Sequence, residues 1–383
     1  MHPDIPLSLY VHIPWCVRKC PYCDFNSHRQ DDRFDESRYI DALVRDLDNE
    51  CEQNPAPSLI SIFFGGGTPS LFSAEAIARI LDETGRRFDF YADIEITLEA
   101  NPGTFEQDKF AAYRDVGINR LSIGIQSFNQ RHLQTLGRIH DANQARTAID
   151  TAFNAGFDNI NLDLMFGLPD QDVTQSVDDV QTAIDAGATH ISHYQLTIEP
   201  NTLFHRHPPV LPDSDLLWDM QLQCQSLLAD SGFEQYEISA YARHGRTGKH
   251  NTNYWQFGDY IGIGAGAHGK QTMIDEEGAV QILRRRKHRQ PEMYMREAMK
   301  GLAVSSRESI AQDDRCFEFL LNALRLKRGV NSALFSQRTG LVLDELRRYS
   351  REIAPELLHI DDGHIGTSDR GYLFLNEILE KLV

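Results

Sequence analysis

The sequence lacks the features of secreted, membrane-spanning and nucleic-acid-binding proteins. No stretch approaches the roughly 20 consecutive apolar residues that a membrane-spanning helix requires. The N-terminal stretch MHPDIPLSLYV has neither the basic start nor the long apolar run of a signal peptide. Basic residues are few, since 38 Lys and Arg stand against 56 Asp and Glu and give a formal net charge of −18. This charge opposes sequence-independent binding to nucleic acid or anionic lipid, so we expect a soluble, cytoplasmic protein.

Cysteine is scarce, and half of it lies in one short stretch. The chain has six cysteines, and three of them form the pattern Cys16-x3-Cys20-x2-Cys23 directly after a strand-like run at residues 8–13. Clustered cysteines in a cytosolic protein are more often metal-binding than disulfide-bonded, and thiolates select an iron–sulfur cluster or zinc. A [4Fe–4S] cluster normally takes four thiolates, so three would leave one iron open to bind a substrate. A zinc site with His28 as the fourth ligand is the alternative.

Strand-like runs alternate with helical patterns along the first half of the chain. The runs lie at residues 8–13, 59–64, 93–99, 120–126, 159–165 and 190–198. This alternation predicts parallel βαβ units with right-handed crossovers, and therefore an α/β fold built on an incomplete (β/α)6 barrel. The chemistry of such barrels lies at the C-terminal ends of the strands. We therefore expect the cysteine loop, the glycine run at residues 65–67, Glu99, Gln126 and Asp163 to meet on one face.

Local signals predict the remaining elements. Apolar spacing indicates helices near residues 34–51, 141–155 and 214–230, Ser73 suits a helix N-cap, and Thr104 with Gln107 suits a capping box. Residues 249–255 are predicted as a loop and the glycine-rich residues 261–269 as a tight turn. Later helices, a hairpin at residues 361–363 and a last helix at 373–382 predict a small winged-helix-like domain. The predicted domains are a barrel with its extension at residues 1–302 and a C-terminal domain at 303–383.

The polar residues at the predicted strand ends have both a functional and a structural interpretation. Glycines at residues 65–67 let the backbone approach a ligand closely, although turn formation alone explains them equally well. Two interpretations also apply to Glu99, Gln126 and Asp163: each binds a ligand, or each faces solvent. Burying a polar side chain without a partner is costly, and most of all for a carboxylate. Arg138 is able to neutralise a carboxylate or to lie on the surface.

Two later segments suggest a second ligand. The basic run at residues 284–289 (RRRKHR) is either a solvated face or a seat for carboxylates such as tetrapyrrole propionates. The segment KHNTNYW contains His250 beside aromatic rings, and imidazole is a common axial ligand of heme iron. The alternative for His250 is a hydrogen-bonded structural histidine.

The motifs taken in order resemble one family. SLYVHIPWCVRKCPYCDF, FFGGGTPS, ITLEANPG, LSIGIQSF, LGRIH, NLDLMFGLP and KHNTNYW are similar to the oxygen-independent coproporphyrinogen III oxidases and their HemW-type heme-chaperone relatives, which are radical S-adenosylmethionine (SAM) proteins. The resemblance implies that Cys16, Cys20 and Cys23 hold a [4Fe–4S] cluster. It implies that the residues around SAM are Tyr10, Tyr22, Gly66, Gly67, Thr68, Glu99, Gln126, Arg138, Asp163 and Gln195.

Two departures from the oxidase pattern favour the heme-chaperone branch. The oxidases carry C-x3-C-x2-C-x-C, whereas Phe25 takes the last position here, and only nine residues precede Tyr10. The H-N-x-x-Y-W motif at residues 250–255 is similar to the mark of the chaperone branch. The resemblance thus implies a carrier that binds heme and a SAM-bound cluster and passes heme to acceptors such as membrane respiratory enzymes at the inner face of the membrane, with His250 as a heme contact. The alternatives are a coproporphyrinogen III oxidase and a zinc-stabilised barrel, and a homodimer is left open.

Overall fold

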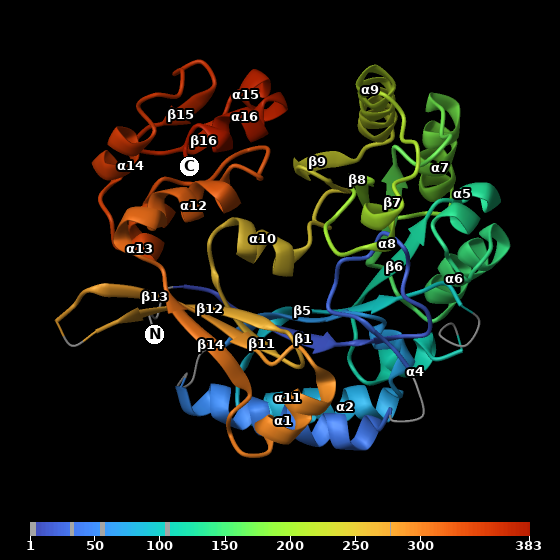
Figure 1. Ribbon diagram of the computed structural model, residues 1–383, viewed down its shortest axis with the longest axis horizontal. Helices are drawn as coiled ribbons and strands as arrows, with labels where there is room; N and C mark the ends of the chain where they lie inside the picture. Colours follow the sequence, from blue (N-terminus) through green and yellow to red (C-terminus); the bar gives the residue numbers. More distant parts are fainter. Residues whose placement is uncertain (1–4, 31–33, 54–57, 104–107, 276) are drawn as a thin grey trace.

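The structure, a computed structural model, describes residues 5–30, 34–53, 58–103, 108–275 and 277–383 (Figure 1). At its centre each strand pairs in parallel with the next one along the barrel. Their burial is nearly continuous, as expected for parallel strands that are covered on both faces. The incomplete (β/α)6 barrel is therefore confirmed, and its strands are β1 (Leu7–Ile13), β4 (Leu59–Gly66), β5 (Phe90–Ala100), β6 (Arg120–Gln126), β7 (Ile160–Phe166) and β8 (His190–Gln195).

Helices connect these strands and cover the convex face of the sheet. The predicted helices near residues 34–51, 141–155 and 214–230 are confirmed as α1 (Glu36–Gln53), α6 (Ala142–Asn154) and α9 (Ser214–Asp230). Ser73 caps its helix as predicted, because its Oγ accepts a hydrogen bond of 3.1 Å from the Ala76 N–H. The predicted capping box at Thr104 and Gln107 lies outside the described residues. The other barrel helices are α2 (Ala74–Gly85), α4 (Phe110–Asp115), α5 (Gln130–Thr135) and α7 (Val173–Asp185).

The chain then returns to the first strand and extends the sheet beyond it. β11 (Asp259–Ile263) pairs in parallel with β1, and β12 (His268–Ile274), β13 (Val280–Lys287) and β14 (Val304–Ser309) follow as antiparallel neighbours. The prediction of a tight turn for residues 261–269 is therefore wrong in part, since two strands flank a short turn. The predicted loop at residues 249–255 is also wrong, because these residues form helix α10 (Lys249–Trp255) on the concave side of the sheet (Figure 1).

Short strands complete the other edge. β10 (Ala240–Ala242) and β9 (Glu234–Glu237) follow β8, so the described part of the sheet has the order β14-β13-β12-β11-β1-β4-β5-β6-β7-β8-β10-β9. One large hydrophobic core lies between this sheet and its helices. The remaining elements of the barrel are β2 (Trp15–Cys16), β3 (His28–Arg29), the 3-10 helix η1 (Pro69–Leu71), α8 (Leu203–Arg206) and α11 (Pro291–Ala298).

The C-terminal part has a core of its own. Buried residues such as Phe319, Phe335, Leu346 and Ile365 form a second hydrophobic cluster that also takes in Phe257. The predicted hairpin at residues 361–363 is confirmed between β15 (Leu358–Ile360) and β16 (Ile365–Thr367). β14 belongs to the main sheet although it follows residue 302. The other elements are η2 (Gln312–Asp314), α12 (Arg315–Ala323), α13 (Ala333–Thr339), α14 (Leu343–Tyr349), α15 (Asp369–Leu373) and α16 (Leu375–Glu380).

Candidate functional site

The cysteine loop leaves the C-terminal end of β1 and is closed at its base by backbone hydrogen bonds. The His28 N–H donates to the Pro14 carbonyl at 2.7 Å, which joins the two ends of the loop. Within the loop, the Cys23 N–H donates to the Cys20 carbonyl at 3.2 Å. The Lys19 ammonium donates to the Phe25 carbonyl at 3.0 Å. The short loop is thus fixed at several points, so its thiols are held over the strand ends.

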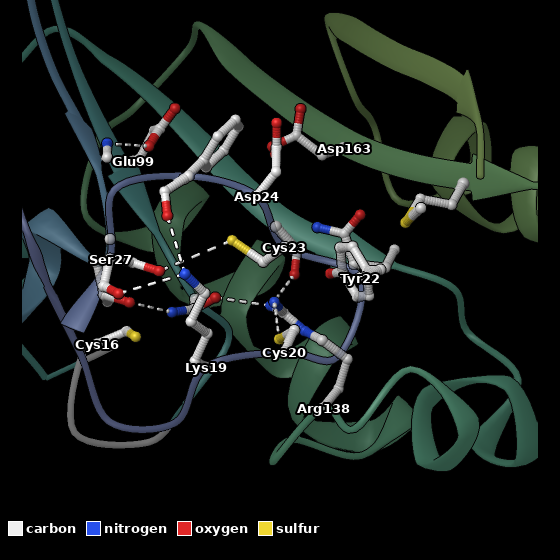
Figure 2. A pocket seen from close by; sticks show the side chains of 18 of the residues that line it. Cys16, Lys19, Cys20, Tyr22, Cys23, Asp24, Ser27, Glu99, Arg138 and Asp163 are labelled. Carbon is white, nitrogen blue, oxygen red and sulfur yellow. Dashed lines mark hydrogen bonds between the residues drawn. The ribbon is translucent and has the colours of Figure 1, made fainter. Parts of the chain in front are cut away.

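These thiols line a cavity of about 350 Å³ above the C-terminal ends of the strands. Figure 2 shows Arg138 beside Cys20, and Glu99 and Asp163 on the strands across from the loop. The structure therefore brings together nearly all of the predicted cluster and SAM residues. Those that line this cavity are Cys16, Cys20, Tyr22, Cys23, Gly66, Gly67, Thr68, Glu99, Gln126, Arg138, Asp163 and Gln195.

The glycine run passes directly under the loop, where side chains do not fit. Gly66 has a φ of +118°, and a Cβ there would lie 2.6 Å from the His12 ring. A Cβ on Gly67 would overlap the carbonyl oxygen of Trp15. Because glycine adopts such a φ without strain and has no Cβ, it leaves a cradle of bare backbone at the cavity wall. The functional interpretation of the glycines thus agrees with their geometry.

Arg138 supplies positive charge at the cysteine loop. Its Nη2 donates to Asn101 Oδ1 and to the Gly124 carbonyl, both at 2.6 Å, and its Nη1 lies 3.7 Å from Cys20 Sγ. A cation beside a thiol stabilises the thiolate. Burial raises the pKa of Cys16 to about 11 in the protein alone, whereas a thiol that coordinates a metal is deprotonated. Arg138 is therefore a half-buried residue of the cavity wall, and the surface alternative does not apply.

Two carboxyl groups in the cavity have raised pKa values. Glu99 Oε2 accepts a hydrogen bond of 3.0 Å from the Gly66 N–H, yet burial and the nearby Asp163 raise the pKa of Glu99 to about 8. Burial also raises the pKa of Asp163, against hydrogen bonds that include one of 2.9 Å from the Asn161 amide. Such paired, perturbed carboxyl groups in a cleft are typical of ligand sites.

Gln126 ends β6 in a strained conformation. Its φ is +72°, a value that non-glycine residues rarely adopt, and its Oε1 accepts a hydrogen bond of 2.7 Å from the Tyr194 hydroxyl. Strain of this kind persists where the surrounding structure holds it, often at ligand sites. Tyr194 and Asn101 also line the cavity but were missed by the sequence analysis. Asn101 stands two residues after Glu99, so its place at a strand end was a usable signal.

Tyr10 lies in a second cavity, which has a volume of about 820 Å³ and adjoins the first. The two cavities share Asp24, Phe25, Gly66 and Glu99 in their walls. The residues that line only the second cavity include Arg286 and Arg289 of the predicted basic run. They also include Tyr254, Tyr260 and His268, which were not predicted to lie with that run. Aromatic and basic side chains thus meet beside the cysteine-lined cavity.

His250 lines neither cavity, so the structure does not bring it together with the other predicted site residues. The side chain is buried, its Nδ1 is hydrogen-bonded to Ser61 Oγ at 3.0 Å, and its Nε2 is hydrogen-bonded to the Tyr254 hydroxyl at 2.8 Å. Burial and the nearby Arg120 lower the pKa of His250 to about 3. Both ring nitrogens are therefore occupied, and the hydrogen-bonded structural alternative describes this residue.

The donor set of the cysteine loop suits a cluster. No group of three or more His, Cys, Asp and Glu side chains in the described ranges is arranged to hold a single metal ion. A four-iron cube needs thiolates that surround a larger volume, and the cavity offers three free cysteines around a space that is bare at the glycine run. Cys16, Cys20 and Cys23 therefore fit a [4Fe–4S] cluster in kind and number.

The partial barrel with a three-cysteine loop at its first strand defines a radical SAM protein. The family model of the radical SAM superfamily matches residues 10–180, and that of the HemN C-terminal domain matches residues 310–374. The solved coproporphyrinogen III oxidase HemN of Escherichia coli, described as a radical SAM enzyme, has the same fold, with a TM-score of 0.82 and 22% identity over 99% of this chain and 90% of that chain.

Closer relatives define the family. The chain is 47% identical to the heme chaperone HemW of Escherichia coli (strain K12), over 98% of this chain and 97% of the relative. It is 33% identical to HemW of Bacillus subtilis over 97% of each chain. It is also 33% identical to the mitochondrial radical S-adenosyl methionine domain-containing protein 1 of Bos taurus, over 98% of this chain and 87% of that relative. The chain belongs to the HemW family of heme chaperones. Membership of the radical SAM class implies SAM and a [4Fe–4S] cluster, which decides against the zinc alternative.

Proposed function

We propose that this protein binds heme next to a SAM-bound [4Fe–4S] cluster and delivers the heme to acceptor proteins. The observation that carries the proposal is the pair of adjoining cavities, one lined by three thiols and the other by aromatic rings and arginines. The full-length similarity to proteins named heme chaperones supports the same conclusion. A flat, apolar macrocycle with two carboxylates needs such a combination of aromatic and basic side chains.

In this proposal the residues of the first cavity hold the cofactors. Cys16, Cys20 and Cys23 would ligate the cluster, which when bound supplies an open iron for the amino and carboxylate groups of SAM. The bare backbone at Gly66 and Gly67 lets a ligand approach the strand ends, and Glu99 offers a carboxyl group beside it. Arg138 keeps positive charge against the loop.

Phe25 supports a carrier in preference to an oxidase. This residue takes the place of the fourth cysteine of the oxidase pattern, its side chain is 59% exposed, and it lines both cavities. An exposed phenyl ring between the two cavities suits contact with an apolar cargo. A sulfur ligand at that position is absent from the sequence.

The proposal also covers the heme acceptors and the place where this protein works in the cell. No helix in the described part of the chain is long and apolar enough to cross a membrane. We infer that the protein works in the cytoplasm and meets membrane respiratory enzymes at the inner face of the membrane, alone or as a homodimer. Crosslinking of the protein to membranes that contain heme-free respiratory enzymes would support this inference. Transfer of heme only to detergent-free lipid vesicles without such enzymes would contradict it.

A side-by-side assay tests the function. The protein reconstituted anaerobically with iron and sulfide is titrated with hemin, and in parallel it is incubated with coproporphyrinogen III, SAM and a reductant. We expect hemin to shift the Soret band at a stoichiometry near one per chain, and we expect no protoporphyrinogen. Steady formation of protoporphyrinogen would replace the chaperone proposal with the oxidase alternative.

A further inference from the structure

We propose that His268 supplies the axial ligand to the heme iron in the second cavity. The inference rests on the proposed function and specifies which side chain of this chain holds the cargo. The imidazoles that face either cavity are candidates for this ligand. In the described residues of the second cavity these are His12 and His268.

His268 is presented to the cavity by the bend between β11 and β12. It is the first residue of β12, its side chain is exposed, and it lies opposite Arg286 of β13 in antiparallel register. Gly262 of β11 has no side chain, and a Cβ there would overlap the His268 carbonyl oxygen. The glycine therefore allows the backbone of His268 to lie against β11, which brings the ring to the same cavity as Tyr10.

Two other side chains of this cavity with a nitrogen or oxygen ligand atom, His12 and Tyr254, are already hydrogen-bonded within the protein. His12 is hydrogen-bonded at both ring nitrogens, at 3.0 Å to the Tyr10 hydroxyl and at 3.0 Å to the Asn26 carbonyl. The Tyr254 hydroxyl is hydrogen-bonded to His250 at 2.8 Å. A tyrosine ligand would also have to lose its proton, and burial raises the pKa of both Tyr10 and Tyr260.

The ring nitrogens of His268 have no hydrogen-bond partner among the side chains and backbone that the structure describes. Partial burial and the nearby Arg286, Arg284 and Arg289 lower the pKa of His268. Imidazole is a common axial ligand of heme iron. The ring nitrogens of His268 are thus free to bind a ligand.

The surroundings of His268 match the rest of a heme. Tyr254 and Tyr260 lie with ring centroids 4.4 Å apart and offer aromatic surface to a macrocycle. Arg286 is held only by an exposed ion pair of 3.7 Å with Glu308, and Arg289 has no carboxylate within 4.0 Å in the described residues. Two arginines are therefore available for two propionates. The cavity of about 820 Å³ is within the range of about 300–1,000 Å³ for small-molecule sites.

The test uses the full-length, anaerobically reconstituted protein and its His268→Ala variant. Hemin is titrated by absorbance, and the ferric complex is examined by electron paramagnetic resonance. Removing a residue that merely supports a metal ligand costs about 10–100-fold in affinity, so loss of the ligand itself should raise the Kd for hemin by at least about ten-fold. His359→Ala is the matched control, because His359 is exposed on β15 in the C-terminal part.

A cavity variant separates ligation from general damage to the site. In His268→Gly, added imidazole should restore the ferric spectrum of the wild-type complex. An unchanged affinity and spectrum in His268→Ala, or a loss that imidazole does not rescue, would overturn the assignment of His268 and leave the chaperone proposal standing. Failure of the wild-type protein to bind hemin would instead overturn the proposed function.

Discussion

Glu99 is a carboxyl group in the wall that the two cavities share, and burial raises its pKa. Its pKa rises from the ordinary value of 4.5 to about 8, because burial and Asp163 both oppose a negative charge. In the unfolded chain the same group ionises near its ordinary value. Between these two pH values the unfolded state releases a proton that the folded state retains. The free energy of unfolding therefore falls as the pH rises from about 4.5 through about 8.

The size of this effect follows from the shift. Each pKa unit is worth about 1.36 kcal/mol, so full ionisation of Glu99 would cost the folded state at most about 5 kcal/mol. Water in the cavity screens the charge, and we expect about half of that value in practice. Glu99→Gln removes the ionisation, while the amide oxygen still accepts the hydrogen bond from the Gly66 N–H. The variant should match the wild type at pH 4 and be more stable at pH 9 by about 2–3 kcal/mol.

Urea unfolding of the protein without its cluster, measured under reducing conditions from pH 4 to pH 9, checks this prediction. Asp163 leaves some pH dependence in the variant, because its pKa is also raised. The quantity to compare is thus the difference between the two curves. Glu352→Gln, at an exposed position, is the matched control and should follow the wild type. Parallel curves for the wild type and Glu99→Gln would refute the argument that burial suppresses the ionisation of Glu99.

Three other substitutions test the cluster site and the packing beneath it. Cys20→Ser should abolish the electron paramagnetic resonance signal of a reduced [4Fe–4S] cluster after anaerobic reconstitution, whereas Cys51→Ser, outside the cavity, should keep it. Gly67→Ala should lower the free energy of unfolding by about 1–3 kcal/mol or more, because the new Cβ would overlap a backbone carbonyl oxygen; an unaltered urea midpoint would contradict this. Lys270→Met should cost about 3–5 kcal/mol in the same assay, because it leaves the buried Asp259, 2.9 Å from the ammonium, without its cation; a neutral change would show that the pair is not needed.

The barrel and most of the first cavity could be predicted from the sequence because their signals are local. Each strand is a short apolar run, and several runs carry a conspicuous polar residue in their second half or at their end, such as Asp163, Glu99 or Gln126. Parallel neighbours end at the same edge of a sheet, so residues far apart in the chain meet without any knowledge of their contacts. That rule placed the cysteine loop and these three residues around one cavity.

The second cavity could not be predicted because no local signal joins its parts. Its walls come from the cysteine loop and from β1, β4, β5, α10, β11, β12, β13 and β14. The later elements join the earlier ones because β11 pairs with β1. β11 is a five-residue strand that contains a glycine, and its sequence does not indicate a partner some 250 positions earlier. Two of the six residues in the basic run at residues 284–289 also have a structural role, since Arg285 and Lys287 pair with Glu50 in the interior.

Helix α10 shows how one motif contributes both a buried supporting residue, His250, and a cavity-lining residue, Tyr254. Its seven residues include Asn, Thr and Tyr, which are weak helix formers, so local propensity indicates a loop. Its tertiary bonds hold the helical form: Asn253 donates to Ser8 Oγ at 3.0 Å and to the Asp259 carbonyl at 2.9 Å. The spacing of His250, Asn253 and Tyr254 places all three on one helix face. His250 therefore fixes the Tyr254 hydroxyl from behind, and Tyr254 presents its ring to the second cavity.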